Sequence, residues 1–224
     1  MPSILFVFTS VDKNLKGGQT GWYLPEAAHP YYVLAPHVQI DFASPKGPNP
    51  PLDLGSAKIF TDDKSVNFLK DETVKQKLAS AKKLSDVNYE DYDAVFYIGG
   101  HGPVIDLPFD LVNSKLVSDF YNSGKITSAV CHGPAALVGG TTPDGKSILA
   151  GKQVTGFTNI EETQNKTLDI IPFLLEDKIK SFGAIFLQTE PWQPKVVVDG
   201  NLITGQNPAS AQSIGEALLE ALTK

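Results

Sequence analysis

Short apolar runs of four to seven residues alternate with longer segments of helical period along the chain. The apolar runs are rich in β-branched and aromatic residues and predict strands that are buried on both faces. They fall at residues 3–10, 38–44, 93–100 and 126–131. Strands that alternate with helices in this way form a mostly parallel sheet, so the pattern predicts an α/β fold.

Helical periodicity predicts four helices. The first three span about residues 21–36, 71–82 and 109–123. One side of the third carries Leu111, Leu116, Phe120 and Tyr121. The last helix follows Asn207, a favourable N-cap residue, and Pro208, which suits a first helical turn. We expect it to pack on the sheet through a stripe formed by Ala211, Ile214, Leu218 and Leu222.

Turn residues complete the predicted fold. Asp199 and Gly200, between the β-rich runs of KVVVDGNLITG, predict a hairpin with a type I′ turn. The segment SPKGPNPPLDLG (44–55) is so rich in Pro and Gly that we expect it to be irregular. A further short strand is predicted at QVTGF. Nothing in the pattern divides the chain, and we expect a single domain over residues 1–224.

Composition and charge narrow the function. The formal net charge is −6, and no basic stripe interrupts the acidic balance, so a nucleic-acid partner is not expected. No apolar run approaches the roughly 20 residues of a membrane helix, and the start lacks the pattern of a secretory signal. The chain contains one cysteine and therefore no internal disulfide. We expect a cytoplasmic protein without a membrane partner.

The single cysteine lies in ITSAVCHGPAAL (126–137), where a predicted strand turns into a helix. Ligand sites of parallel sheets form beyond the carboxyl ends of strands, where TSVDK, GGHGP and CHGPA also fall. We expect the N-terminal end of that helix to lower the pKa of the Cys131 thiol, with His132 as added positive charge or base. A lone cysteine is more often a small buried apolar residue, but a strand end followed by CHGP favours a reactive thiol.

Three histidines, His29, His101 and His132, lie beside Gly or Pro at predicted element ends. The glycines around His101 allow the backbone to approach a ligand, so the amides of Gly99 and Gly100 are candidates for an oxyanion hole. A structural turn would explain the same stretch equally well. Cys131 and the histidines could also bind a metal, but no spacing typical of zinc ligands is present, and none is expected.

Three glutamates are candidates for acid–base chemistry. Glu26 stands in GWYLPEAAHPYYVL, an otherwise aromatic and apolar helix, where burial would raise the pKa of its carboxyl group. GFTNIEET supplies Glu161 and Glu162, and either could orient a histidine as the third member of a triad. Sequence spacing does not choose between these two.

Five motifs occur in order: TGWYLPEAAHPY, IGGHGPVIDLP, AVCHGPAAL, VTGFTNIEET and LITGQNPASA. With them the chain resembles the ThiJ/PfpI superfamily, and within it the glyoxalase III branch, whose members are also described as heat-inducible chaperones. The resemblance runs from the first strand to the last helix. It implies a flavodoxin-like three-layer sandwich, with a mostly parallel central sheet flanked by helices, and a nucleophilic cysteine on a strained strand-to-helix elbow.

The resemblance also implies residue roles. Cys131 matches the nucleophile and His132 its basic partner. Glu162 matches the acid of the triad, because it falls five residues after Phe157 of the GFT motif. Glu26 matches the carboxylate that contacts the cysteine sulfur. Adjacency to the motifs makes Trp22, Trp192 and Phe157 plausible pocket walls, although core packing is the more ordinary role for Phe157.

The activity implied by the resemblance is conversion of methylglyoxal, a small 2-oxoaldehyde, to D-lactate without glutathione, which protects against reactive carbonyls. Cys131 would form a hemithioacetal, Glu26 or His132 would move a proton between adjacent carbons, and a thioester would be hydrolysed. The amides of Gly100 and His132 would stabilise the oxyanion, with His101 beside the substrate. Glycated adducts are a further candidate substrate. No cofactor is implied, and the family commonly forms homodimers.

Two other functions remain open from the sequence. A stress-responsive chaperone or redox sensor would need an exposed apolar patch, or an oxidisable Cys131 beside a protonated Glu26, and little turnover. A peptidase or amidotransferase would use a Cys-His-Glu set for acyl transfer. An enzyme needs His132, Glu162 and Glu26 intact, whereas chaperone action should survive Cys131→Ala.

Overall fold

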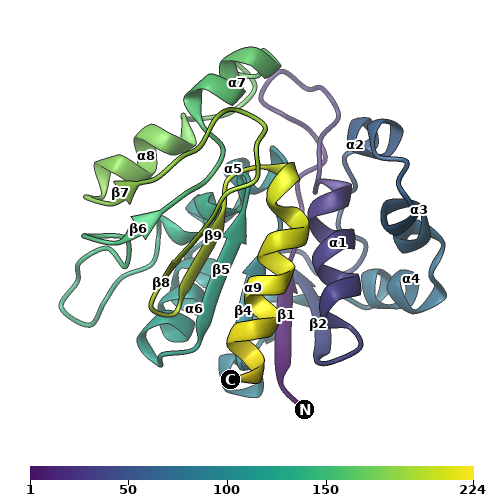
Figure 1. Cartoon of the computed structure of the whole chain (residues 1–224), viewed down its shortest axis with the longest axis horizontal. Helices are drawn as coiled ribbons and strands as arrows, with labels where there is room; N and C mark the ends of the chain where they lie inside the picture. Colours follow the sequence, from purple (N-terminus) through teal and green to yellow (C-terminus); the bar gives the residue numbers. More distant parts are fainter.

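A seven-stranded sheet forms the centre of the computed structural model, which describes all 224 residues (Figure 1). The strand order is β3-β2-β1-β4-β5-β9-β8, and only the β8–β9 pair is antiparallel. The strands are β1 (Ser3–Val7), β2 (Gln39–Ser44), β3 (Lys82–Lys83), β4 (Ala94–Tyr97), β5 (Ile126–Val130), β8 (Val196–Asp199) and β9 (Leu202–Gly205). The order β2-β1-β4-β5-β9 is that of flavodoxin-like folds, so the predicted α/β class with a mostly parallel sheet is confirmed.

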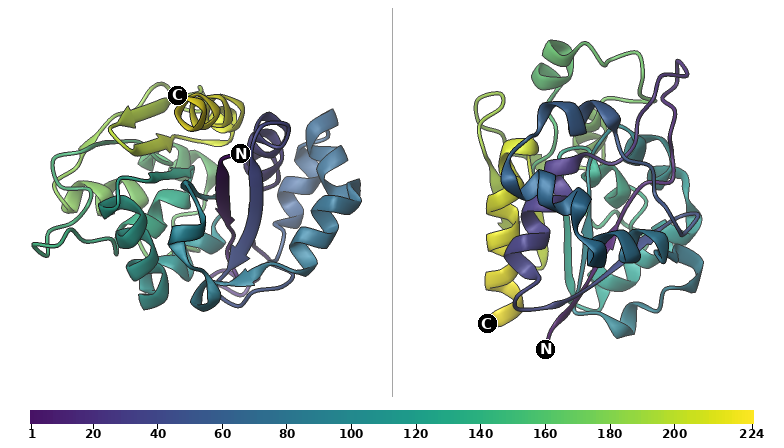
Figure 2. Two further views of the ribbon diagram at one scale, coloured as in Figure 1. Left: turned by 90° about the horizontal axis from the view of Figure 1, so that it is seen from below. Right: turned by 90° about the vertical axis from the view of Figure 1, so that its right-hand side faces the viewer.

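Helices cover both faces of the sheet, which gives three layers (Figure 2). α1 (Leu24–Leu34) and α9 (Ala211–Thr223) lie side by side on one face, and α6 (Leu111–Asn122) lies on the other. Gly215 allows α9 to approach α1 closely, because a Cβ atom there would lie 2.8 Å from Pro30 Cα. The helices α2 (Leu54–Ile59), α3 (Asp63–Lys70) and α4 (Glu72–Ala79) extend beyond α1. No helix combines the length and apolar character needed to cross a bilayer.

Short elements connect these layers. A separate two-stranded parallel sheet joins β6 (Gln153–Val154) to β7 (Ile185–Phe186), with α7 (Asn159–Asn165) and α8 (Leu175–Ser181) between them in the chain. The remaining elements are α5 (Gly102–Ile105), η1 (Leu84–Asp86), η2 (Tyr89–Asp91), η3 (Leu107–Phe109), η4 (Gly133–Leu137) and η5 (Pro208–Ser210). In the predicted short strand QVTGF, only Gln153 and Val154 pair as a strand.

One continuous hydrophobic core lies between the layers. The central strands are buried along nearly their whole length, as their largely apolar and β-branched sequences predict. Register positions the site: β4 and β5 pair Tyr97 with Ala129, so the residues that follow both strands emerge next to each other at one end of the sheet.

The predicted helices at 21–36 and 109–123 are confirmed as α1 and α6. In α6, Leu116 and Phe120 are buried as expected, but Leu111 is 83% exposed. The expectation for Leu111 was wrong because nine residues at about 100° each place it on the opposite side of the helix from Phe120. In the closing helix the expected stripe is confirmed, with η5 forming its first turn after the cap residue Asn207.

The predicted helix at 71–82 is only partly correct. It ends as α4 at Ala79, and Lys82 and Lys83 then add a short edge strand to β2. The irregular segment is confirmed up to Asp53, whose side chain caps α2. The pattern missed α2 and α3, because both are short helices that bury few apolar side chains.

The predicted β8–β9 hairpin is confirmed, but its turn type is not. Asp199 pairs with Leu202, so Gly200 and Asn201 form the turn. Only Gly200 has a positive φ, at 62°. A single positive φ at the first turn position is typical of a type II′ turn, whereas type I′ requires two.

We expect Asp110→Ala to destabilise the face covered by α6. The Asp110 side chain accepts hydrogen bonds from the backbone N–H groups of Val112 and Asn113. Removal of such an N-cap costs about 1 kcal/mol of the free energy of unfolding, which chemical denaturation would measure. The control is Asp12→Ala, an exposed aspartate outside any helix, with an expected effect within about 0.5 kcal/mol. Equal losses in both variants would contradict the capping role.

Candidate active site

A small pocket opens at the carboxyl ends of β4 and β5. Its lining residues are Tyr23, Gly100, His101, Cys131, His132, Phe157, Asn165, Trp192 and Pro208. About 30 Å³ is available to the centres of water-sized atoms. One water requires roughly 10–15 Å³ by the same measure, so the pocket admits a molecule of only a few heavy atoms.

Cys131 occupies a sharp turn between β5 and η4. Its φ of 60° lies in the left-handed region, which is uncommon for a residue other than glycine. Two hydrogen bonds hold this conformation: Cys131 N–H donates to Gly205 O at 2.9 Å, and Phe157 N–H donates to Cys131 O at 2.8 Å. Strained backbone of this kind concentrates at functional sites. The sulfur therefore projects from a backbone that β9 and the segment after β6 hold in place.

The loop after β4 supplies backbone to the pocket. Gly100 has a φ of 105°, and a Cβ atom there would lie 2.3 Å from Gly21 O, so only glycine fits. The N–H groups of Gly100 and His132 donate to no acceptor in the protein. Unpaired amides beside a nucleophile can donate to an oxyanion that forms on the substrate.

Glu26 lies in the first turn of α1 and is fully buried. The Cys131 thiol and the Gly99 amide face its carboxyl group, but neither contact meets hydrogen-bond geometry. Gly99 makes this approach possible, because a Cβ atom there would lie 2.2 Å from Glu26 Oε2. Burial raises the pKa of Glu26 well above its usual range, so the group is a neutral acid at neutral pH.

The Cys131 thiol is not the low-pKa group that its place in the sequence suggested. Burial raises the pKa of Cys131 well above its usual range. The helix that follows is a 3₁₀ segment of five residues and has too little macrodipole to offset this desolvation. Cys131 therefore rests as a thiol and needs a base to become a nucleophile.

His132 is placed to act as that base. Its Nε2 lies 2.6 Å from Glu162 Oε2, and its Nδ1 lies 3.5 Å from Cys131 Sγ. Burial lowers the pKa of His132 despite the nearby carboxylate, so the ring is neutral at neutral pH. Because an ionised Glu162 can only accept, the ring proton sits on Nε2, and the lone pair on Nδ1 faces the thiol.

Glu162 is the ionised acid of the site. Burial opposes its ionisation, but the interactions with His132 and His101 outweigh burial and lower the pKa of the carboxyl group. Oε1 accepts hydrogen bonds from His101 Nε2 at 3.2 Å and from the Thr167 hydroxyl. The His101 and His132 rings lie 4.5 Å apart. Glu162 therefore orients two imidazoles at once.

Glu161, the other triad candidate, does not reach His132. Its Oε2 accepts hydrogen bonds from the N–H and hydroxyl of Thr158, which completes a capping box and starts α7. Its Oε1 accepts a hydrogen bond from Trp192 N–H at 2.8 Å. The structure thus separates the two glutamates, which spacing alone could not, and Glu162, the residue that the family resemblance implies, is the one that pairs with His132.

His101, His132 and Glu162 could also hold a metal ion. Their ligand atoms lie within 4.8 Å of one another, and two histidines with one carboxylate are a usual set for Zn²⁺. The same atoms, however, form the hydrogen bonds between Glu162 and the two imidazoles. A metal at this position would break the His132–Glu162 pair, so ion binding and the triad exclude each other.

Other expectations for the pocket are met in part. Phe157 and Trp192 line it, but Trp22 lies in the core, where its indole N–H donates to Pro50 O. TSVDK does not reach the pocket, because Thr9 and Ser10 donate to Asp106 instead.

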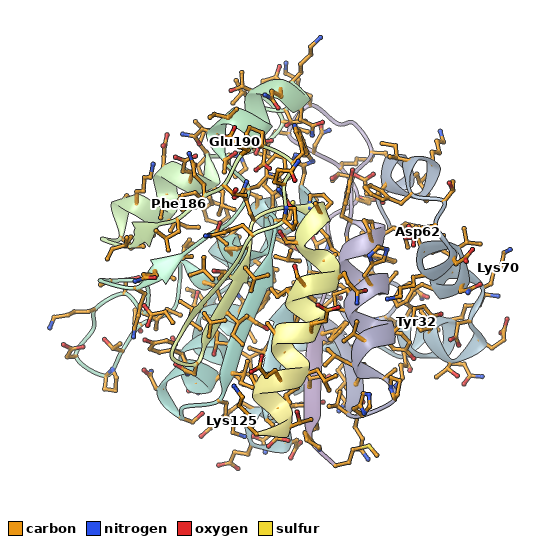
Figure 3. All side chains as sticks on the ribbon, viewed as in Figure 1. Tyr32, Asp62, Lys70, Lys125, Phe186 and Glu190 are labelled. Carbon is orange, nitrogen blue, oxygen red and sulfur yellow. The ribbon has the colours of Figure 1, made fainter.

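Some residues lie away from the pocket, and others enter it unpredicted. His29 pairs with Asp62, which lies on the side of α1 that faces α2 and α3 (Figure 3). Tyr23, Asn165 and Pro208 line the pocket but were not predicted. Tyr23 and Pro208 lie within two of the five motifs, and Asn165 follows a third by two residues, which is their only sequence signal.

The raised pKa of Glu26 predicts a specific dependence of stability on pH. Above the ordinary glutamate pKa of about 4.3, the unfolded chain loses the Glu26 proton while the folded chain keeps it. As pH rises, wild type should therefore lose stability relative to Glu26→Gln, by up to about 1.4 kcal/mol per pH unit, until the folded-state pKa is reached. Urea denaturation from about pH 5 to about pH 8 would measure this difference.

The control for this measurement is Glu90→Gln, an exposed glutamate on η2. Its stability should follow that of wild type at every pH. A constant difference between wild type and Glu26→Gln would show that Glu26 is ionised in the folded protein.

Comparison with known proteins places this site in a family. The model of the DJ-1/PfpI family matches residues 26–221. A glutathione-independent glyoxalase of Saccharomyces cerevisiae is 34% identical over 92% of this chain and 91% of its own, and glyoxalase 3 of Candida albicans is 32% identical over 99% and 98%.

Solved structures agree with these relatives. Rapid Encystment Protein 24 KDa of Francisella tularensis has a TM-score of 0.94 at 36% identity and covers 99% of both chains. Glyoxalase III of Candida albicans has a TM-score of 0.86 at 29% identity and covers 99% of this chain and 97% of its own. The resemblance drawn from the five motifs is thereby confirmed, and the chain belongs to the DJ-1/PfpI family.

Proposed function

We propose that the protein is a glutathione-independent glyoxalase that converts methylglyoxal to D-lactate. The observation that carries this proposal is a buried thiol between a neutral imidazole and a neutral carboxyl group, beside a pocket that admits only a few heavy atoms. The curated relatives with glyoxalase names support it along more than nine-tenths of the chain.

The first step is addition of Cys131 to the aldehyde. His132 Nδ1 accepts the thiol proton, and the Sγ–C1 bond forms as the C1=O π bond becomes an oxyanion. The imidazolium then returns the proton to this oxygen, which becomes the hydroxyl of a hemithioacetal and leaves His132 neutral. The N–H groups of Gly100 and His132 stabilise the oxygen while it carries negative charge. Glu162 keeps its charge and stabilises the imidazolium that forms.

The second step moves hydrogen from C1 to C2 without any external oxidant. A base removes the C1 proton, the C2 carbonyl becomes an enediolate, and a proton returned to C2 leaves a lactoyl thioester. Glu26 and His132 both lie beside the Cys131 sulfur and are the candidate carriers, and a neutral Glu26 can give its proton first and recover it later. Water then hydrolyses the thioester, which releases lactate and restores the thiol.

Pocket size separates this activity from the acyl-transfer alternative. Cys131 is only 3% exposed, and the space beside it accepts a few heavy atoms. A peptide bond flanked by two chain segments does not fit such a pocket, whereas a three-carbon aldehyde does. The structure therefore favours a small 2-oxoaldehyde over a polypeptide substrate. A homodimer and a cytoplasmic location stay predictions.

Substitution of the site should separate the enzyme from a chaperone without turnover. With methylglyoxal and no glutathione, we expect Cys131→Ala to abolish D-lactate formation. His132→Gln and Glu26→Gln should each lower kcat/KM by roughly 10²–10⁴-fold, the range for loss of an acid or base. An enantiomer-specific lactate assay measures the product.

The matched control is His29→Gln, whose imidazole pairs with Asp62 outside the pocket. It should keep wild-type activity. Absence of D-lactate from wild type would reject the glyoxalase, whereas equal activity in all variants would reject the assigned residues.

A further inference from the structure

Trp192 is the second strained residue of the pocket, besides Cys131. Its φ is 65°, and a bulky residue in this left-handed region is an outlier that glycine or asparagine would normally replace. The residue is also 42% exposed, so its ring gains less from burial than an indole in the core. Neither backbone preference nor core packing explains a tryptophan here.

Three contacts fix the indole against the pocket. Trp192 N–H donates to Glu161 Oε1 at 2.8 Å, and its Nε1–H donates to Gln164 Oε1 at 2.6 Å. The ring lies edge-on to Phe157 at 5.6 Å between centroids. The backbone N–H, the ring nitrogen and the indole ring thus each contact a different residue, and the indole has a defined position.

The segment around Trp192 is anchored as well. Glu161 Oε1 also accepts from the side-chain amides of Gln206 and Asn207, and Asn207 donates to Gln193 O at 2.8 Å. The buried Glu161 carboxylate therefore ties this segment to α7 and to the end of β9, and the wall that Trp192 forms is fixed.

We propose that Trp192 sets the upper size limit of the substrate by closing the outer side of the pocket. One side of the indole lines the pocket and the other meets solvent, so its removal would extend the space beside Cys131 outward. This inference rests on the proposed glyoxalase activity and names its substrate class. 2-Oxoaldehydes with a hydrogen or methyl substituent fit the pocket, and aromatic 2-oxoaldehydes are excluded from it.

The test compares kcat/KM for phenylglyoxal and methylglyoxal in wild type and Trp192→Gly. Glycine is the appropriate replacement because it adopts the φ of 65° without strain, so the backbone is preserved while the ring is removed. We expect the phenylglyoxal to methylglyoxal ratio to rise by about tenfold or more, in line with the discrimination that a pocket wall provides. Gln164→Leu, which frees the indole nitrogen, should raise the ratio by a smaller factor.

Two controls match these variants. Phe109→Ala removes another exposed aromatic ring, and Gln76→Leu changes an exposed glutamine on α4. Both should leave the ratio at its wild-type value. A wild-type ratio in Trp192→Gly would overturn the proposal even if methylglyoxal is turned over.

Alkylation of the single cysteine tests the wall without any turnover. For each protein, the rate of Cys131 alkylation by the small reagent iodoacetamide is divided by the rate with the bulky reagent N-phenylmaleimide. We expect this ratio to be higher in wild type than in Trp192→Gly under the same conditions. If wild type forms no D-lactate but the two proteins differ in this ratio, the proposed function is rejected and the role of Trp192 as a pocket wall is retained. An equal ratio in both proteins would reject the proposal that Trp192 closes the outer side of the pocket.

Discussion

The proton that Glu26 keeps controls the chemistry of this site. A carboxylate in the fully buried position of Glu26 would oppose ionisation of the sulfur beside it, because two negative charges would share a region without solvent. A neutral carboxyl group has no such effect and can donate toward the sulfur or the substrate. Desolvation by the first turn of α1 maintains the neutral form, and Gly99 leaves room for the carboxyl group to approach.

Two buried glutamates close to one cysteine are held in opposite protonation states by their surroundings. Glu26 has no partner with hydrogen-bond geometry and stays neutral, whereas Glu162 accepts from His132, His101 and Thr167 and stays ionised. Acid and base roles are commonly assigned by such differences in environment. The neutral group can give a proton, and the ionised group orients the imidazole that takes one.

The sequence predicted the parts of this arrangement that leave local marks. Short runs rich in apolar, β-branched and aromatic residues identified the central strands, and turn residues located the β8–β9 hairpin. Motifs identified Cys131, His132 and Glu26 as candidates before any geometry was known. These features depend on residues that are close together in the chain, where periodicity and turn chemistry act directly.

Features that depend on distant contacts were not accessible in the same way. Residue spacing left the choice between Glu161 and Glu162 open, because adjacent helical residues point about 100° apart and the position of α7 relative to β5 decides which one reaches His132. Only the family resemblance selected Glu162. The pKa of the Cys131 thiol was predicted in the wrong direction because local sequence suggests a helix terminus but not the depth of burial. Trp192 contacts the pocket from a segment whose position depends on Glu161, Gln206 and Asn207 together.

The separation of Glu161 and Glu162 also couples the triad to the pocket wall. Both carboxylates project from the first turn of α7, Glu162 toward His132 and Glu161 toward the Trp192 segment. A shift of α7 that widened the pocket would therefore also lengthen the His132–Glu162 hydrogen bond of 2.6 Å. Substrate size cannot be adjusted by moving this helix without loss of the base. It can be adjusted by exchange of the side chain at position 192, which leaves both carboxylates in place.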